Sequence, residues 1–248
     1  MLIVNRCTVA GNTTSLDGGG IFNPTGSQFT LLSSTIHGNS ARNGGGLSCT
    51  GATLVATSCT FTANTADVGG ACYLTGGGPA SLLKHLTLTN NRVNNPSGGG
   101  GIFLDQQNVS LQNCIVAGNT APYLTTPDGD ITKLSGSITP TGVNLIGNLS
   151  VYGLVAGPSV ITGAPLLAPL GNYGGPTPTM PPLSASPATD AASVLAPAFT
   201  TDQRGFPIVG KPDIGAVEFG LRVTTLADEL NAPGTPGAGI SLREAVRD

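Results

Sequence analysis

Acidic side chains with a spacing that could bind an ion are few in this chain. Asp128 and Asp130 alternate with glycine in the segment Pro127-Asp-Gly-Asp-Ile131, and Asp17 and Asp67 each stand just before a glycine cluster. Carboxylate oxygens in a flexible turn are the ligands that Ca²⁺ prefers, although aspartates also cap turns without any metal. We expect ordinary polar turns and no cofactor, with calcium at either pair as the alternative.

The chain has few residues suited to enzymatic chemistry. Glycoside hydrolysis needs two or three carboxylates that converge on one site, and polysaccharide lyases need a base beside a bound calcium ion. The two histidines, His37 and His85, have no partner at a repeated spacing, so we expect both on the solvated surface. We therefore predict a protein that is not an enzyme, with a polysaccharide lyase or glycosidase as the alternative.

Internal repeats are the elements that must position these residues. Four segments share one pattern ending in asparagine and a fifth is a weaker copy: Cys7–Asn12, Ser34–Asn39, Cys59–Asn64, Cys114–Asn119 and, weaker, Leu86–Asn91. The successive asparagines are separated by 27, 25, 27 and 28 residues, and a glycine cluster follows each of the first four. A period in the twenties with strand-like composition is typical of a solenoid.

Apolar side chains recur at fixed distances before each asparagine. Three residues before it stand Val9, Ile36, Phe61, Leu88 and Val116. Two further apolar files stand eight and ten residues before it, and a polar pair at six and seven shifts the phase. Each repeat therefore predicts about three short strands with one inward face. Because one repeat cannot bury that face alone, the repeats must stack, which predicts an all-β, right-handed parallel β-helix from Met1 to about Ala121.

The repeated asparagine has a physical reason. Asparagine at a bend tolerates a left-handed backbone, and its amide can bond the same amide in the coils above and below. We therefore predict a structural ladder of Asn12, Asn39, Asn64, Asn91 and Asn119. The glycine clusters mark corners at which a side chain would obstruct a neighbouring coil.

The repeat period ends after residue 121, and the rest of the chain divides by composition. We place the β-helix coils at residues 1–143, an irregular proline- and glycine-rich region at 144–220, and a strand with a short helix at 221–248. The segment from Gly136 to Gly147 is expected to add one or two irregular coils. The segment from Pro158 to Pro197 is expected to wrap the flank of the β-helix or to cap its C-terminal end.

Four blocks of the irregular region carry a resemblance. They are Pro165–Thr179, Ser186–Asp190, Thr201–Gly205 and Pro212–Glu218. In this order they resemble the choice-of-anchor Q domain of bacterial surface and secreted proteins, whose bodies are right-handed β-helices similar to pectin-lyase-like solenoids. The upstream repeats resemble those of polymorphic outer-membrane proteins. Where the anchor family usually has histidine this chain has Met180, which argues against a metal or catalytic role there. We expect Arg204 to pair with Asp213 or Glu218 as a structural clasp.

The stretch after residue 220 resembles the CSLREA element, with Ile240 in place of its cysteine. Ser241 and Glu244 have the spacing of a capping box, so a short helix is expected from Leu242. In the family this element precedes a β-helix and closes its N-terminal end, whereas here it follows the body. We expect it either to cap the open first coil of another copy, head to tail, or to begin the next β-helix of a tandem protein; truncation is the remaining alternative. The residues expected to form this cap are Ser241, Leu242, Glu244 and Val246.

The five cysteines cannot all pair with one another. Cys7, Cys59 and Cys114 each stand five residues before a repeat asparagine, so we expect one column of free thiols that act as small apolar side chains. Cys49 and Cys72 follow glycine clusters in successive repeats and could approach each other, so a disulfide is the alternative there. Neither a Cys-x-x-Cys motif nor a paired histidine suggests zinc.

Charge and hydropathy limit the partners of this chain. Charged residues make up 9 % of it and the net charge is -3, so a nucleic-acid surface is not expected. No apolar run is long enough to cross a membrane. We predict an extracellular or cell-surface structural module, a stalk or fibre subunit whose partner is another copy or an adjoining repeat. A glycan-binding adhesin is a further alternative, although the absence of tryptophan disfavours it.

Overall fold

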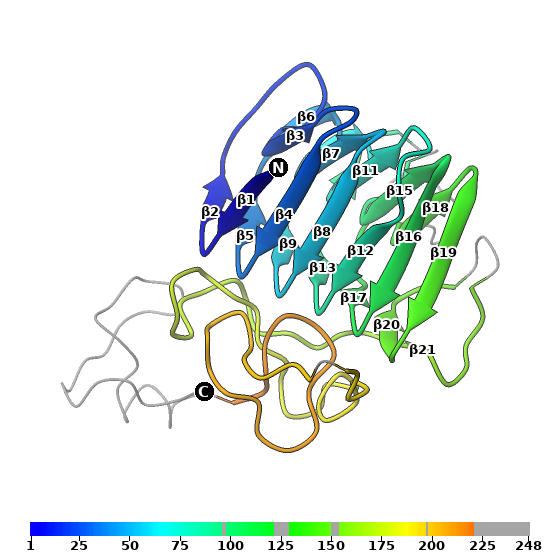
Figure 1. Cartoon of the computed structure of the whole chain (residues 1–248). Coiled ribbons are helices and arrows are strands. Elements are labelled where there is room, and N and C mark those ends of the chain that lie inside the picture. Colours follow the sequence, from blue (N-terminus) through cyan, green and yellow to red (C-terminus); the bar gives the residue numbers. More distant parts are fainter. Residues whose placement is uncertain (96–97, 122–128, 150–153, 197, 221–248) are drawn as a thin grey trace.

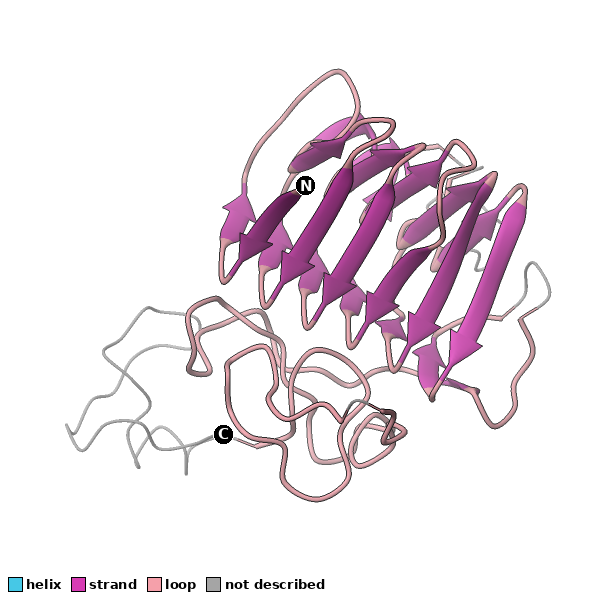
Figure 2. Cartoon of the chain, viewed as in Figure 1, coloured by secondary structure: helices cyan, strands magenta, loops and turns pink. Residues whose placement is uncertain are grey.

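The computed structural model of the chain describes residues 1–95, 98–121, 129–149, 154–196 and 198–220. This described part is all-β and contains no helix. Its strands form a right-handed parallel β-helix of about five turns, which confirms the predicted fold class (Figures 1 and 2). The predicted capping helix lies outside the described residues.

Four parallel sheets run along the β-helix. Sheet A contains β1 (Leu2–Asn5), β4 (Gln28–Leu32), β8 (Thr53–Thr57), β12 (Ser81–Lys84), β16 (Gln107–Gln112) and β19 (Gly136–Thr141). Sheet B contains β2 (Thr8–Ala10), β5 (Thr35–His37), β9 (Thr60–Thr62), β13 (Thr87–Thr89), β17 (Ile115–Val116), β20 (Asn144–Ile146) and β21 (Val160–Thr162). Sheet C contains β6 (Ser40–Asn43), β10 (Thr65–Val68) and β14 (Arg92–Val93). Sheet D contains β3 (Ile21–Asn23), β7 (Leu47–Thr50), β11 (Cys72–Thr75), β15 (Ile102–Asp105) and β18 (Ile131–Lys133).

The apolar file predicted three residues before each asparagine lies in one line through sheet B. Strand pairing joins its members in succession, from Val9 through Ile36, Phe61 and Leu88 to Val116. All of them belong to or pack against one continuous core between the sheets. Stacking thus buries the inward face that no single coil could bury alone.

A column of left-handed residues turns the chain from sheet A into sheet B. The residue six places before each asparagine has a positive φ between 44° and 54°: Arg6, Ser33, Ser58, His85 and Asn113. This bend coincides with the polar pair at which the inward phase shifts in the sequence. One residue in the left-handed region is enough to re-aim the alternation of the following strand.

The β-helix continues past the boundary expected at residue 143. In sheet B, β20 pairs with β17 and β21 pairs with β20, so the sheet extends to Thr162. In sheet A, β19 pairs with β16 over the full length of both strands. The irregular coils after the repeats therefore belong to the same stack.

The chain from residue 163 to residue 220, which we call the wrap, lies along the outer face of sheet B (Figure 1). Its Gln203 is buried between two coils, since its side-chain amide donates to Thr35 Oγ1 at 2.8 Å and its oxygen accepts from Thr60 Oγ1 at 2.7 Å. The Thr87 hydroxyl accepts the backbone N–H of Ala216 at 3.1 Å. The wrap therefore covers the outward threonine column of sheet B. Of the two expected arrangements, this is the one in which the segment wraps the flank of the β-helix.

One repeat is aligned differently from the sequence-based expectation. Cys72 pairs with Leu47 and with Ile102, so Ala71 takes the place that Gly46 and Gly101 hold in the neighbouring coils. Counted from its glycine cluster, this strand would begin Gly-Ala71-Cys72, with Ala71 facing inward as Leu47 and Ile102 do. The observed pairing shifts it by one residue, which turns Tyr73 outward beside Phe103. The cluster of Gly69 and Gly70 is one residue shorter than the cluster at Gly44–Gly46, so counting from it places the strand one residue too early.

Candidate functional site

The predicted asparagine ladder runs through the interior as an unbroken chain of hydrogen bonds. Each side-chain amide nitrogen donates to the Oδ1 of the next asparagine at 2.9 to 3.0 Å, and the backbone N–H of the same residue donates to that Oδ1 at 3.0 to 3.1 Å. The amide also donates backwards to a carbonyl of the previous coil, as Asn64 does to Ile36 at 2.9 Å. The amides inside the ladder are thereby fully used, as buried polar groups must be.

The left-handed backbone expected at these asparagines belongs to the preceding residue instead. Gly11, Gly38, Ala63, Asn90 and Gly118 have positive φ between 55° and 75°. The bend therefore turns just before the ladder, which leaves the asparagine side chain free to point inward. Ala63 is the one member of this column whose Cβ has to tolerate the left-handed region without a side-chain polar group.

Asp130 ends the ladder. Its Oδ1 accepts the backbone N–H and the side-chain amide of Asn119, both at 2.9 Å. In earlier coils the equivalent place is held by Gly20, Gly46 and Gly101, with Ala71 as the exception that carries a Cβ. A Cβ at Gly46 or Gly101 would lie 3.2 or 2.9 Å from the ladder amide nitrogen of Asn64 or Asn119. In the last coil the carboxylate itself occupies the place where the next asparagine would lie.

The environment of Asp130 opposes its charge. Burial raises its pKa to about 6, against hydrogen bonds from Asn119 and the backbone of Asn148 that lower it. The sequence predicts an ordinary polar turn at Asp130, with calcium as the alternative; in the structure its Oδ1 serves the ladder. Asp128 lies outside the described residues.

The two aspartates of the other calcium candidate, Asp17 and Asp67, do not lie in one column. Asp17 lies beside Asn43, whose next neighbour in sheet C is Val68, so Asp67 does not share a register position with Asp17. Asp17 Oδ1 instead accepts from Asn43 at 3.0 Å and from Arg42 at 3.2 Å. Among the described residues no group of three or more His, Cys, Asp or Glu could hold a metal ion.

The clasp in the wrap has a different partner from the one expected. Arg204 pairs with Asp202, whose Oδ2 lies 2.8 Å from both Nε and Nη2 of the buried guanidinium. The remaining guanidinium donors bond the backbone carbonyls of Glu218 at 2.9 Å and Gly220 at 3.0 Å. Arg204 therefore holds the end of the wrap through its backbone and not through the carboxylates of Asp213 and Glu218.

Those two carboxylates close a separate loop. Asp213 accepts the backbone N–H groups of Asp190 and Phe219, and Glu218 Oε1 accepts the backbone N–H of Asp213 at 2.9 Å. Burial raises the pKa of Asp213 and raises that of Glu218 to about 7. Their hydrogen bonds make them part of the fold of the wrap.

His85 is buried, contrary to the expectation of a solvated surface residue. The Asn113 amide lies 3.2 Å from its Nε2, the backbone carbonyl of Gly215 takes part in a second hydrogen bond, and the ring stacks on Phe199 with centroids 4.1 Å apart. If Asn113 donates to Nε2, the proton of the neutral ring is on Nδ1 and points to Gly215. Burial lowers the His85 pKa to about 4, so the ring stays neutral and joins the wrap to the β-helix.

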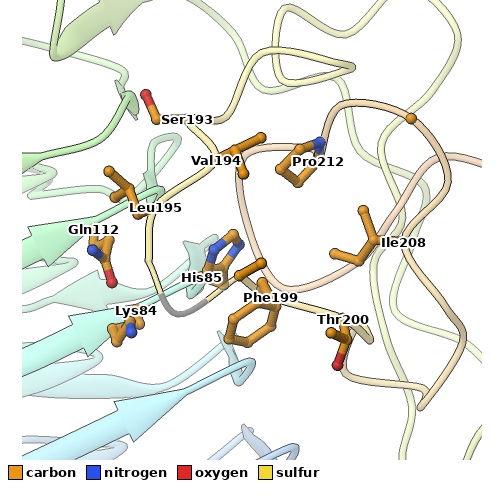
Figure 3. A pocket seen from close by; sticks show the side chains of 12 residues that line it. Lys84, His85, Gln112, Ser193, Val194, Leu195, Phe199, Thr200, Ile208 and Pro212 are labelled. Atoms are coloured by element: carbon orange, nitrogen blue, oxygen red, sulfur yellow. The ribbon is translucent and has the colours of Figure 1, made fainter.

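A cavity of about 290 Å³ opens beside this histidine (Figure 3). Its β-helix side is formed by Lys84 and Gln112, which are paired across β12 and β16. Its other side is formed by the wrap, from which Val194, Ile208 and Pro212 face the space. Spacing along the chain does not reveal this cavity, because its two sides are more than 80 residues apart.

Aromatic side chains gather on the outer face of sheet D, which sequence reasoning missed. Tyr73 and Phe103 stack with centroids 5.4 Å apart and planes 12° from parallel. Phe22 occupies the same outward column two coils before Tyr73, with Ser48 between them, and is 53 % exposed. The signal for this column is the second residue after each glycine cluster. It is obscured because the cluster before Cys72 is one residue shorter than the cluster at Gly44–Gly46.

The five thiols are free. Cys59 and Cys114 are fully buried in the column expected from the repeats, whereas Cys7 in the first coil is exposed. Cys49 pairs in register with Leu74 and Cys72 with Leu47, so the two thiols are offset along neighbouring strands. The alternative of a disulfide between them is not realised.

Comparison of the chain with protein-family models, curated proteins and solved structures finds no significant match. Within the described residues, no helix has the length and apolar character needed to cross a membrane.

Proposed function

We propose that this chain is an extracellular, non-catalytic β-helix module that builds length, as a stalk segment or as a subunit of a fibre. The open first coil is the observation that carries the proposal. Leu2 faces inward in register with Phe29, yet it is 60 % exposed while Phe29 is 2 % exposed. The first strands of sheets A, B and D are edges of the stack, and uncovered edges of this kind favour association with another strand row.

The asparagine ladder supports the same conclusion. Among the described residues, no N–H group donates to the Oδ1 of Asn12, although each later ladder oxygen accepts two. A coil placed before the first one would supply these donors. Asp130, at the far end, only accepts hydrogen bonds when ionised, so the last coil of a second copy cannot continue the ladder.

We propose two sources of cover for this first coil. A preceding coil of a longer tandem polypeptide would supply it, and so would the C-terminal element at 221–248 of a second copy. The extracellular location depends on the resemblance of residues 144–219 to the anchor domain of surface proteins. The structural role is supported by the carboxylates: Asp17, Asp105, Asp130, Asp202, Asp213 and Glu218 each accept a hydrogen bond or form an ion pair within the fold.

The proposal is tested by the size of the purified chain as its concentration rises. We expect light scattering after size exclusion to report growing oligomers, and electron microscopy to show rods. Leu2→Glu should abolish growth, because it places a charge in the open coil, whereas Leu183→Glu, in the wrap and 47 % exposed, should not. Monomers at every concentration, or growth unaffected by Leu2→Glu, would contradict head-to-tail assembly. Cleavage of a polysaccharide would favour the enzymatic alternative.

The aromatic column of sheet D favours glycan binding as a second candidate function. Phe22 and Tyr73 present ring surface on one outward face, and sugar rings pack on such surfaces. Screening the chain on a glycan array together with Phe22→Ala and Tyr73→Ala would test it. Binding that both substitutions abolish would support an adhesin.

A further inference from the structure

The cavity between the β-helix and the wrap has the electrostatics of an anion site. Among the described residues that line it, Lys84 carries the only charged side chain, because His85 is neutral and no acidic residue is among them. Lys84 forms no ion pair with the residues that the structure describes. An unneutralised ammonium in a chain of net charge -3 favours a negatively charged occupant.

Lys84 also has a neighbour that can share an anion. Gln112 lies next to it on the adjacent coil, as the strand register and Figure 3 both show. The two residues stand on neighbouring strands, whose backbones are about 4.8 Å apart in a parallel sheet. The ammonium and the amide at the ends of their side chains can donate to the two oxygens of one carboxylate.

The opposite walls are apolar. Val194 and Pro212 approach the space from two segments of the wrap, and Ile208 points into it (Figure 3). Val194 is 68 % exposed although it faces this space, so a ligand that covers it would remove apolar surface from water. The hydroxyls of Ser193 and Thr200 point away from the centre (Figure 3), which leaves the body of a ligand without polar partners.

The volume limits the occupant. About 290 Å³ is close to the lower end of the range of small-molecule sites and corresponds to about ten molecules of liquid water. A short acyl chain or a single ring fits this space, whereas a polymer does not.

We propose that this cavity binds a small amphipathic carboxylate. The carboxylate lies at Lys84 and Gln112, and the apolar body lies against Val194, Ile208 and Pro212. This site is independent of the assembly proposed above, since it lies on the flank of the β-helix and not at the first coil.

The experiment is calorimetric titration of the full chain with hexanoate, hexan-1-ol and galacturonate. Hexanoate is expected to bind about tenfold or more tightly than hexan-1-ol, because only the anion forms charge-assisted hydrogen bonds. Lys84→Met should remove this preference, and Lys133→Met, the same change on sheet D, should preserve it. Val194→Glu should weaken hexanoate binding by a similar factor. Because Val194 is exposed, the substitution should leave the fold intact, and an unchanged circular dichroism spectrum checks this.

Three results would overturn the proposal. Equal affinity for hexanoate and hexan-1-ol would show that Lys84 does not recognise the charge. Tighter binding of galacturonate would assign the cavity to sugar acids instead. Absence of measurable hexanoate binding to the folded chain would show that the cavity is not a site of this class.

Discussion

The Asp130 carboxylate accepts both the backbone and the side-chain N–H of Asn119, each at 2.9 Å, and thereby ends a ladder that begins at Asn12. The direction of this ladder is fixed, because every hydrogen bond between two ladder amides is donated toward the C-terminal end. A carboxylate has acceptors only, so it is a suitable last member and an unsuitable first one. The two ends of the β-helix are therefore chemically different.

Asp130 should make the chain more stable as the pH falls from 7 to 4. Its folded pKa of about 6 lies above the unfolded value of 3.8, so the folded state binds a proton in this interval before the unfolded state does. The gain is about 2 kcal/mol by pH 4. Asp130→Asn has no titrating carboxyl at this position and lacks this gain. The difference in unfolding free energy between wild type and variant should therefore grow by that amount from pH 7 to pH 4. Urea unfolding followed by circular dichroism measures it.

His85 should act in the opposite direction. Its folded pKa of about 4 lies below the unfolded value of 6.5, so the unfolded state binds the proton first and stability is lost as the pH falls between these values. The loss is about 2 kcal/mol between pH 7 and pH 5. His85→Asn, which suits the left-handed bend as Asn113 does, should be less stable at pH 7 and should lose less on acidification. An equal pH dependence of the two proteins would show that His85 is not buried in its neutral form.

These two residues also mark the limit of sequence reasoning. The repeat predicted the coils, the inward files and the ladder, because a stacked β-helix repeats the same contact every 25 to 28 residues. Asp130 and His85 break the repeat, and their roles depend on contacts that occur once. The wrap, the cavity and the Arg204–Asp202 pair likewise join segments without a shared period, so spacing along the chain carries no signal for them.

Position along the ladder should decide the cost of losing an asparagine. Asn64 is fully buried, and Asn64→Ala would leave the side-chain and backbone N–H groups of Asn39 without their acceptor. We expect a loss of about 3 kcal/mol or more. Asn12→Ala, at the exposed start, should cost less than about 1 kcal/mol. Equal losses in chemical denaturation would contradict the ladder as a buried network.

Ala63→Gly should stabilise the chain. Ala63 has φ 55°, a conformation that costs an L-residue about 1–2 kcal/mol, and its counterparts Gly11, Gly38 and Gly118 are glycine. Glycine adds entropy to the unfolded chain, which offsets part of this gain, so the net increase should be about 0.5–1 kcal/mol. Gly38→Ala serves as the converse, because its Cβ would meet only one atom within 4 Å, at 3.9 Å, and its loss would be conformational. The thermal unfolding midpoint should rise for Ala63→Gly and fall for Gly38→Ala. A fall for Ala63→Gly would contradict this account.

Thiol reactivity should separate Cys7 from the other four cysteines. Cys7 is exposed in the open coil, whereas Cys49, Cys59, Cys72 and Cys114 are buried. Burial raises the pKa of Cys59 and of Cys114 to about 12, so at pH 8 their reactive thiolate is scarce as well as inaccessible. A disulfide-exchange reagent should therefore modify one thiol per folded chain quickly and all five after unfolding in urea. Cys7→Ser should abolish the fast phase. Because Cys7 lies in the first coil, assembly at high concentration should also slow its modification, and a rate independent of concentration would place that coil outside the contact between copies.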